Sequence, residues 1–302
     1  MRPMIYDCFI FNDELDLLEL RLRYLNNKVD KFVLVESERT MSGNKKVLHF
    51  KTNQHRFKKF EDKIIHLTAP VNNLSVWDYE FFQRNYIKEA LVQCMQNDII
   101  IITDIDEILD IPAILSNKNF SFPSLIEINM FYYFLNIKTN DNWSFPLICY
   151  WKQIENINIG SRVTYSKNIT QNVLLQDGEI NGWHFSYLYG NDIELYQKKI
   201  ESFTHQEFNK PYFLDTKRIN RCVNFKIDLF ERPSVKLTHN NKYILPLAQY
   251  IEGTPLEKLM YTQPSLKKYL QPSNLFFILY HKIYKRKKYL LRNFIKKLYN
   301  KL

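Results

Sequence analysis

The first hundred residues alternate short apolar runs with amphipathic segments, and this alternation constrains the fold more than any other feature. Four apolar runs predict buried strands, at residues 5–11, 31–35, 64–67 and 98–103. Two segments between them carry apolar side chains at helical spacing, residues 13–25 and 78–96. Strands that alternate with helices in this way are typical of an α/β domain with a parallel sheet. We therefore expect a mixed, mainly parallel sheet flanked by helices.

The pattern changes after residue 120. Aromatic and β-branched residues cluster up to residue 183, with Asn, Asp and Pro between the clusters. This composition predicts further strands and long loops that complete the same domain. Pro264 and Pro272 mark the next change in the chain. We therefore expect one domain over residues 1–262 and a tail over residues 263–302.

Positive charge is concentrated in this tail. The formal net charge is +10, from 42 Lys and Arg against 32 Asp and Glu. Nine of the basic residues lie within residues 274–302, which contain no acidic residue. The remaining 33 basic residues nearly balance the 32 acids, so the body of the protein is close to neutral. This distribution argues against nucleic acid as a partner and favours an anionic partner for the tail.

The tail also has the pattern of a basic amphipathic helix. Its apolar positions fall near one helical face: Phe276, Tyr280, Ile283, Leu291, Phe294, Leu298 and Leu302. Its basic positions fall mostly on another face: Lys282, Lys285, Arg286, Arg292 and Lys296. A helix of this kind lies in the headgroup region of an anionic membrane. The alternatives are a helix that docks on the domain with its charges in water, and a nucleic-acid contact.

Two absences bear on the expected compartment. The four cysteines show no C-x-x-C spacing, so neither a zinc knuckle nor a redox motif is predicted. The N-terminal apolar run is interrupted by Asp7, unlike a signal peptide, and no run of 18 apolar residues predicts a membrane span. We expect a cytoplasmic protein that is peripheral on the membrane.

The sharpest chemical signal is the sequence Asp104-Ile105-Asp106-Glu107, directly after the predicted strand 98–103. Ligands of open α/β sheets bind beyond the carboxyl ends of the strands. Carboxylates there can hold a divalent cation, which in turn can bind a diphosphate. The alternative is a helix N-terminus at which acids complement the dipole. A D-x-D phosphatase of the haloacid dehalogenase type is disfavoured, because its motif follows the first strand rather than the fourth.

Six segments in order resemble one known family. They are IYDCFIFNDELDLLELRLRYL, VDKFVLVESERTMSG, a helix with Glu80, Gln83, Arg84 and Asn85, DIIIITDIDEI, GWHFSY and KKIESFTHQE, within residues 4–210. Together they resemble glycosyltransferase family 17, the family of the bisecting β-1,4-N-acetylglucosaminyltransferase. The resemblance implies a GT-A-like fold, a nucleotide-sugar donor, Mn²⁺ or Mg²⁺ as cofactor, and inversion at the anomeric carbon.

Candidate site residues follow from the strand ends and from this resemblance. The candidate metal ligands are Asp104, Asp106 and His184, the last because imidazole suits manganese. The candidate donor-binding residues are Asn12, Glu36, Arg84 and Asp104. Plainer alternatives stand beside them: His184 packed between aromatic side chains, Glu36 at a solvated strand end, and Arg84 in a surface ion pair with Glu80 one turn away.

An inverting transfer also needs a base that takes the proton of the acceptor hydroxyl. The candidates are Asp177, Glu179 and Glu207, because they flank the GWHFSY and THQE segments. The sequence does not rank them, and an acid of this kind is more often a surface residue than a base.

The resulting expectation is a metal-dependent, inverting glycosyltransferase. It would transfer N-acetylglucosamine from a UDP-sugar to a glycan or lipid-linked glycan. One alternative is a non-catalytic membrane- or glycan-binding protein with the same fold. Another is a sugar-phosphate transferase.

Overall fold

The computed structural model describes residues 2–169, 171–176, 178–285 and 287–291. Its first sheet has seven strands in the order β10-β6-β9-β4-β1-β2-β3. The four predicted strands are confirmed as β1 (Ile5–Ile10), β2 (Lys31–Glu36), β3 (Ile64–Thr68) and β4 (Ile99–Asp104). They pair in parallel, as the strand–helix alternation predicts. The remaining strands are β6 (Ser124–Ile126), β9 (Leu147–Tyr150) and β10 (Asn172–Val173).

A second sheet accounts for the change of pattern after residue 120. Its order is β12-β8-β7-β11-β5. Its strands are β5 (Glu107–Leu109), β7 (Ile128–Tyr132), β8 (Ile137–Trp143), β11 (Gly182–Ser186) and β12 (Leu237–His239). The fold is therefore mixed α/β, but with two mixed sheets where the sequence predicts one. The chain passes from the first sheet to the second between β4 and β5, within the D-x-D segment.

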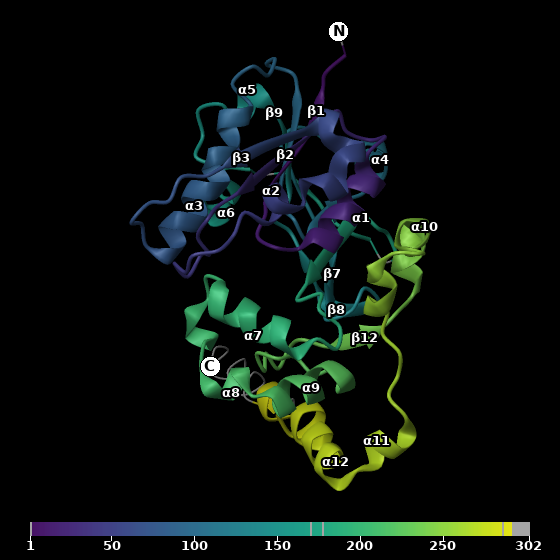
Figure 1. Cartoon of the computed structure of the whole chain (residues 1–302). Coiled ribbons are helices and arrows are strands. Elements are labelled where there is room, and N and C mark those ends of the chain that lie inside the picture. The colour runs from purple at the N-terminus through teal and green to yellow at the C-terminus, as the bar shows by residue number, and fades with distance from the viewer. Residues whose placement is uncertain (1, 170, 177, 286, 292–302) are drawn as a thin grey trace, which may run out of the picture.

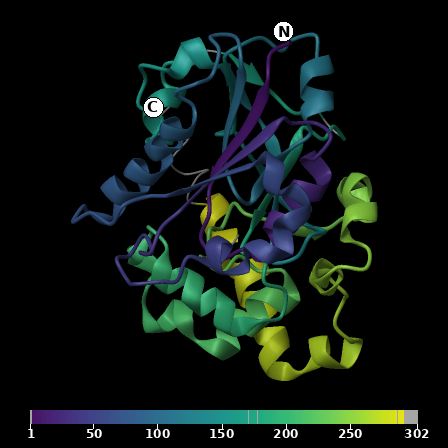
Figure 2. The same ribbon diagram turned by 45° about the horizontal axis from the view of Figure 1, so that its top comes forward.

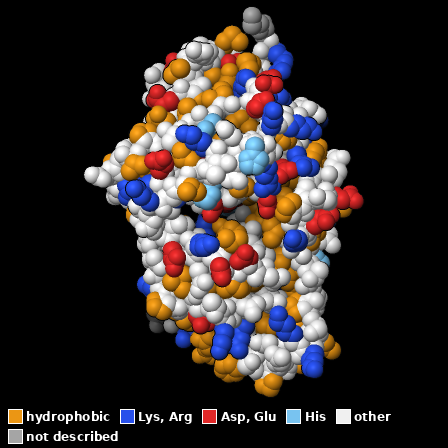
Figure 3. All heavy atoms as spheres, viewed as in Figure 1, with side chains coloured by type: hydrophobic (Ala, Val, Ile, Leu, Met, Phe, Trp, Pro, Cys, Tyr) orange, Lys and Arg blue, Asp and Glu red, His pale blue; other side chains and the backbone are white. Residues whose placement is uncertain are grey.

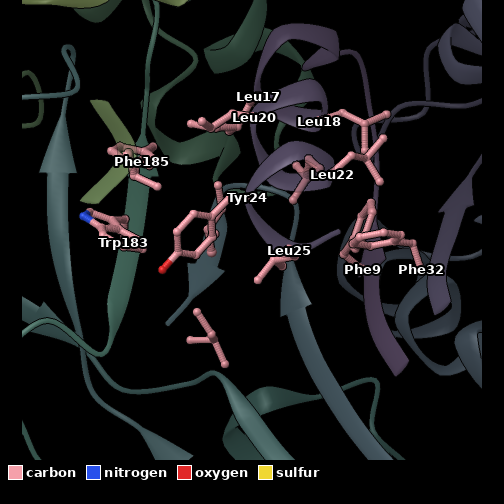
Figure 4. Packing of buried hydrophobic residues seen from close by; sticks show 14 of the residues in the cluster. Phe9, Leu17, Leu18, Leu20, Leu22, Tyr24, Leu25, Phe32, Trp183 and Phe185 are labelled. Atoms are coloured by element: carbon pink, nitrogen blue, oxygen red, sulfur yellow. The ribbon is translucent and has the colours of Figure 1, made fainter. Parts of the chain in front are cut away.

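One helix packs between the two sheets. It is α1 (Leu15–Leu25), whose leucines from Leu17 onward are buried together with Tyr24. Figure 4 shows these side chains between Phe9 and Phe32 of the first sheet and Trp183 and Phe185 of the second. The Tyr24 ring meets the Trp183 ring edge to face, at 5.3 Å between centroids. Burial of this apolar surface holds the sheets together at the point where the chain crosses between them.

Further helices lie around the first sheet. They are α2 (His49–Asn53), η1 (Gln54–Lys63), α3 (Val76–Tyr86), η2 (Ile87–Ala90), α4 (Ile111–Ser116), α5 (Trp151–Ile154) and α6 (Arg162–Ser166). The helix predicted over residues 78–96 is shorter than expected, because α3 ends at Tyr86 and a 3₁₀ turn follows.

The second half of the chain adds a helical part below the sheets in Figure 1, and Figure 2 shows the same arrangement. Its elements are α7 (Ile193–Ser202), η3 (Gln206–Phe208), α8 (Pro211–Leu214), α9 (Thr216–Phe225), α11 (Leu266–Leu270), α12 (Pro272–Leu279) and the π-helix η6 (Tyr280–Lys285). Three further short helices lie beside α1 instead: η4 (Lys242–Leu247), α10 (Ala248–Ile251) and η5 (Pro255–Leu259). An apolar cluster of its own, which includes Tyr196, Ile219 and Phe225, lies beneath β7.

The described part of the tail is mostly helical. A short helix, α11, is followed by α12, by the π-helix η6 directly after it, and by helical residues 287–291. Phe277 and Ile278 pack on the helical part, whereas Phe276 is 74% exposed. Arg286 and residues 292–302 lie outside the described residues. Among the described residues, no helix combines the length and apolarity needed to cross a bilayer.

Candidate functional site

A cavity of about 470 Å³ lies where the sheets meet the helical part. The space-filling view shows a recess in this region, bordered by charged and hydrophobic side chains (Figure 3). Its lining comes from the end of β1, the loop after β2, α3, the β4–β5 turn, α6 and the end of α7. The carboxyl ends of β1 and β4 therefore open into one cavity, as expected for ligand binding by an open α/β sheet.

The backbone of the β4–β5 turn is held in place by Arg21 of α1. Arg21 of α1 donates hydrogen bonds to the carbonyl oxygens of Asp104 (2.8 Å), Ile105 (3.2 Å) and Glu107 (2.8 Å). The same guanidinium forms a fully buried ion pair with Asp7 of β1, at 2.6 Å. The backbone of the D-x-D segment is thus fixed by α1 and β1 before any ligand binds.

Asp104 ends β4 and lines the cavity between two guanidinium groups. Its Oδ1 lies 2.7 Å from Arg162 and 3.2 Å from Arg84. Burial works to raise the pKa of this carboxyl, but the two arginines outweigh it and hold the pKa far below its ordinary value. Asp104 is therefore ionised and already partnered, which leaves its remaining lone pairs for a ligand.

Glu107 is buried behind Asp104 and has no free bonding capacity toward the cavity. Its carboxylate accepts hydrogen bonds from both terminal nitrogens of Arg162 (2.6 and 3.1 Å) and from the Trp143 indole (2.6 Å). It also accepts one from the backbone N–H of Asp104 at 3.0 Å. Arg162 thus links Asp104 to Glu107, and Glu107 orients the groups that face the cavity.

Asp106 lies beside His184, although the two are far apart in the sequence. Their Oδ2 and Nε2 atoms are 3.6 Å apart. Burial works to lower the pKa of His184, but the Asp106 carboxylate outweighs it and raises the pKa. Possible ligand atoms of Asp106, Glu107 and His184 all lie within 4.8 Å of one another. Because Glu107 is fully engaged, Asp106 and His184 are the pair that could hold a divalent cation.

Strand pairing brings His184 to this place. His184 pairs with Glu107 across the antiparallel β11–β5 ladder and with Met130 across the parallel β11–β7 ladder. A Cβ atom at Gly182 would lie only 2.4 Å from the carbonyl oxygen of Ile108, so glycine permits this close approach. The Trp143 ring lies 4.7 Å from the imidazole. His184 therefore combines aromatic packing with a position beside Asp106.

Arg84 pairs with Glu80, but it is buried rather than on the surface. Its guanidinium donates to Glu80 (2.9 Å), to the Gly160 carbonyl (2.7 Å) and to Asp104 (3.2 Å). The side chain is buried and lines the cavity. Asn12 also lines the cavity, and its carbonyl oxygen accepts a hydrogen bond from Lys46 at 3.0 Å.

Glu36 is not brought to the cavity, and it is not at a solvated strand end either. It is fully buried, and its carboxylate accepts the backbone N–H groups of Phe50 and Lys51, each at 3.0 Å. His66 lies 2.8 Å from the same carboxylate. These partners assign Glu36 to the N-terminus of α2, where a carboxylate satisfies free N–H groups.

The three candidate bases fall in different places. Glu179 lines a separate cavity of about 420 Å³ that is bordered by α4 and the segment before β11. Glu207 is exposed and accepts a hydrogen bond at 2.8 Å from His205, which lines the cavity that contains Asp104. Asp177 lies outside the described residues. Of the described candidates, only Glu207 is thus connected to that cavity.

Several lining residues carry charge that the sequence did not single out. Lys199 lies 3.3 Å from Glu14, and both face the cavity. Burial works to lower the pKa of Lys199, but Tyr189 and the carboxylates of Glu14 and Asp106 keep it well above its ordinary value. Lys199 belongs to the KKIESFTHQE segment, which could have indicated it. No sequence signal indicated Arg162.

Aromatic side chains form the rim of the cavity. Trp77 is 44% exposed, and its ring meets the His205 ring edge to face at 5.1 Å. Phe81, Phe145 and Phe203 also line the cavity. Ring faces beside buried charges are suited to a ligand that combines a sugar or base with a phosphate.

Comparison with known families gives one match. The sequence pattern of glycosyltransferase family 17 matches residues 1–273. No curated protein matches the chain. The match includes every candidate site residue that faces the cavity, together with α11.

Proposed function

The chain belongs to glycosyltransferase family 17 and is a glycosyltransferase, and we propose that it transfers N-acetylglucosamine from a UDP donor with inversion, in a metal-dependent reaction on a GT-A-like fold. The observation that carries this proposal is the Asp106–His184 pair beside the clamped Asp104 in one cavity. The donor sugar is proposed from the family alone.

The donor set fits a divalent cation. A carboxylate oxygen and an imidazole nitrogen 3.6 Å apart can occupy adjacent positions around one ion, and the mixed set suits Mn²⁺ better than Mg²⁺. The His184 Nδ1 atom is buried without a hydrogen-bond partner, so it imposes no competing orientation on the ring. The ion would neutralise charge on the leaving diphosphate. Asp104, held by two arginines, would then accept hydrogen bonds from the donor or from water at the ion.

Cationic side chains supply the rest of the diphosphate environment. Arg84 and Arg162 are buried and Lys199 is held in its charged form, and all three line the cavity. Buried cations with fixed positions stabilise developing negative charge without reorganisation. The two arginines position Asp104, and Lys199 is a cation of the same cavity that could bind a phosphate oxygen.

The base is proposed among three glutamates. Glu14 and Glu80 line the cavity, and Glu207 is connected to it through His205. Glu80 is held in place by Arg84 and by the Thr204 hydroxyl. Replacement of each by Gln removes the base but keeps the shape, so the true base is the one whose loss stops transfer while metal-dependent donor binding persists.

The acceptor is proposed to be a glycan or lipid-linked glycan at the cytoplasmic face of a membrane. The exposed rings of the tail support this location, and the aromatic rim of the cavity offers faces for a sugar. Docking on the membrane would keep the enzyme beside a lipid-linked acceptor.

The test measures nucleotide release from a panel of UDP- and GDP-sugars, with and without Mn²⁺. Wild type is compared with Asp106→Ala and with Asp192→Ala, an exposed acid outside the cavity. We expect Mn²⁺-dependent UDP release from UDP-N-acetylglucosamine that is lost in Asp106→Ala and retained in Asp192→Ala. Equal release by both variants, or release without added metal after chelation, would overturn the metal site. Release from another sugar would correct the donor.

A further inference from the structure

A second charged cavity, of about 260 Å³, lies between the loop after α9 and the π-helix η6. Five cationic side chains line it: Lys226, Arg232, Lys236, Lys282 and Lys285. Only two carboxylates line it, Asp228 and Glu231. The glycosyltransferase cavity described above shares no lining residue with it. This tail cavity therefore needs its own explanation.

Both carboxylates of the tail cavity are already neutralised. Asp228 pairs with Arg232 at 2.7 Å and also accepts the backbone N–H of Arg232 at 2.7 Å. Glu231 accepts hydrogen bonds from Lys285 and Tyr212, and Arg218 lies 3.4 Å away. These acids consequently have nothing left to offer the other cations.

Three lysines of the cavity remain without a carboxylate partner among the described residues: Lys226, Lys236 and Lys282. The Lys226 ammonium instead lies over the Tyr261 ring, at 4.7 Å. Burial and, after it, the Lys226 charge lower the pKa of Lys282 to about 8. His281 adds no charge at neutral pH, because burial lowers its pKa to about 4. Unneutralised ammonium groups that face one cavity repel each other, and a bound anion would relieve this repulsion.

An apolar stripe runs along the exposed side of the same helical segment. Phe276, Tyr280 and Tyr284 are 74%, 39% and 56% exposed. Their rings stack in a row, with 6.4 Å and 5.7 Å between successive centroids. Leu279 and Ile283 extend the stripe, and each is 46% exposed. The cavity lysines thus alternate along η6 with aromatic and aliphatic side chains that are 39–56% exposed.

We propose that the tail cavity binds the phosphate of an anionic phospholipid while the apolar stripe inserts beside it into the membrane interface. Lysine ammonium groups are suited to phosphate as point charges, and aromatic side chains are suited to the headgroup region. A free phosphate would account for the cavity but not for the adjacent stripe, so charge and apolar surface together favour a lipid. This inference rests on the membrane location proposed above, and it does not depend on the transferase chemistry.

The experiment measures binding of the full chain to vesicles of phosphatidylcholine, with and without phosphatidylglycerol, by co-sedimentation. The variant Lys226→Gln/Lys282→Gln removes two cavity charges. Lys58→Gln/Lys59→Gln removes two exposed charges of η1 and is the matched control. At roughly 1 kcal/mol for each lysine, the cavity variant should bind phosphatidylglycerol vesicles about 30-fold more weakly, and the control less than about 3-fold more weakly. UDP release should be unchanged in both variants, because none of the four lysines lines the glycosyltransferase cavity.

Three results would overturn the proposal. Equal weakening in the two double variants would show that only net charge matters. Equal binding of wild type to vesicles with and without phosphatidylglycerol would show that the stripe acts alone. Binding of inorganic phosphate without binding of phosphatidylglycerol vesicles would assign the cavity to a free anion. If the double variant does not fold, Lys282→Gln alone carries the test, because Lys282 has no carboxylate partner among the described residues, with an expected weakening of about 5-fold.

Discussion

The cavity that contains Asp104 and the tail cavity both concentrate charged side chains, but they balance the charge in different ways. In the first, Arg84 and Arg162 are buried and paired with Asp104 and Glu107. In the second, the carboxylates are used up by Arg232 and Lys285, and three lysines are left over. Paired guanidinium groups hold neighbouring carboxylates in fixed positions, whereas unpaired ammonium groups remain available to bind an anion.

The two cavities also differ in how much their charged side chains contribute to the stability of the fold. A buried ion pair is strongly destabilising to break, because the partner that remains is left uncompensated. An unpaired surface lysine has no partner to lose. Loss of a cation should therefore destabilise the protein strongly at the first cavity and hardly at all at the second. The predictions follow in order of decreasing effect.

The largest effect is expected for Arg162→Met. The variant leaves Glu107, whose side chain is 1% exposed, without its bidentate partner. We expect a loss of about 3–5 kcal/mol in the free energy of unfolding, measured by urea denaturation. Arg56→Met, which breaks partly exposed pairs with Asp16 and Glu19, is the control and should lose no more than about 1 kcal/mol. Similar losses in both variants would contradict the contrast between the cavities.

The next effect concerns catalysis. His184→Ala removes the imidazole beside Asp106 while Asp104 keeps its two arginines. The Mn²⁺ concentration for half-maximal UDP release should rise by about 100-fold, since even outer groups of a metal site contribute 10–100-fold. His55→Ala, an exposed histidine outside the cavity, should leave it unchanged. If the Mn²⁺ dependence of UDP release is unaltered in His184→Ala, this histidine packs against its neighbours but does not bind the metal.

A smaller effect is expected from pH at the tail. The His281 side chain is 6% exposed, and burial lowers its pKa to about 4, with Glu231 opposing this shift and Lys285 and Arg218 adding to it. The unfolded chain therefore binds a proton at His281 below about pH 6.5 that the folded protein does not bind. Stability should fall as pH falls through this window, by about 2 kcal/mol between pH 6.5 and 5.

The measurement is urea unfolding at several pH values for wild type and His281→Asn. The variant lacks the titrating group, so its stability should decrease less over the same window, and the difference between the two slopes is the His281 contribution. Parallel slopes would show that the docked tail does not exclude water from this imidazole.

The smallest effect is expected for Lys226→Gln/Lys282→Gln in the absence of membranes. These lysines have no acidic partner among the described residues, so removal of their charge breaks no ion pair. The free energy of unfolding should change by no more than about 0.5 kcal/mol, and a small gain would reflect relief of repulsion. A loss above 2 kcal/mol would mean that these lysines are structural.

Much of the first sheet could be predicted from local patterns. Apolar runs flanked by polar residues located β1, β2, β3 and β4, and the acids after the last of these lie in the main cavity. The second sheet could not be separated from the first, because the chain changes sheets inside three residues, where no composition shift marks the boundary. The helix predicted to residue 96 ends at Tyr86, where the 3₁₀ helix η2 begins.

Individual roles were less predictable than elements. Glu36 follows the same strand-end pattern as Asp104, yet it binds the N–H groups at the start of α2. The tail has the periodicity of one amphipathic helix, yet Phe277 docks on the body while Phe276 stays exposed. A local pattern cannot show which polar group or apolar face another segment will cover.

Sequence patterns were sufficient to predict the order of strands and helices in the first part of the chain, the place of the D-x-D acids, and the family. These depend on spacing between near neighbours, which the sequence displays directly. Tertiary structure alone decided that His184 lies beside Asp106, that Arg162 links Asp104 to Glu107, and that η6 closes a cavity over the loop after α9. Those contacts join distant segments, and they depend on strand register and side-chain packing that no local spacing encodes.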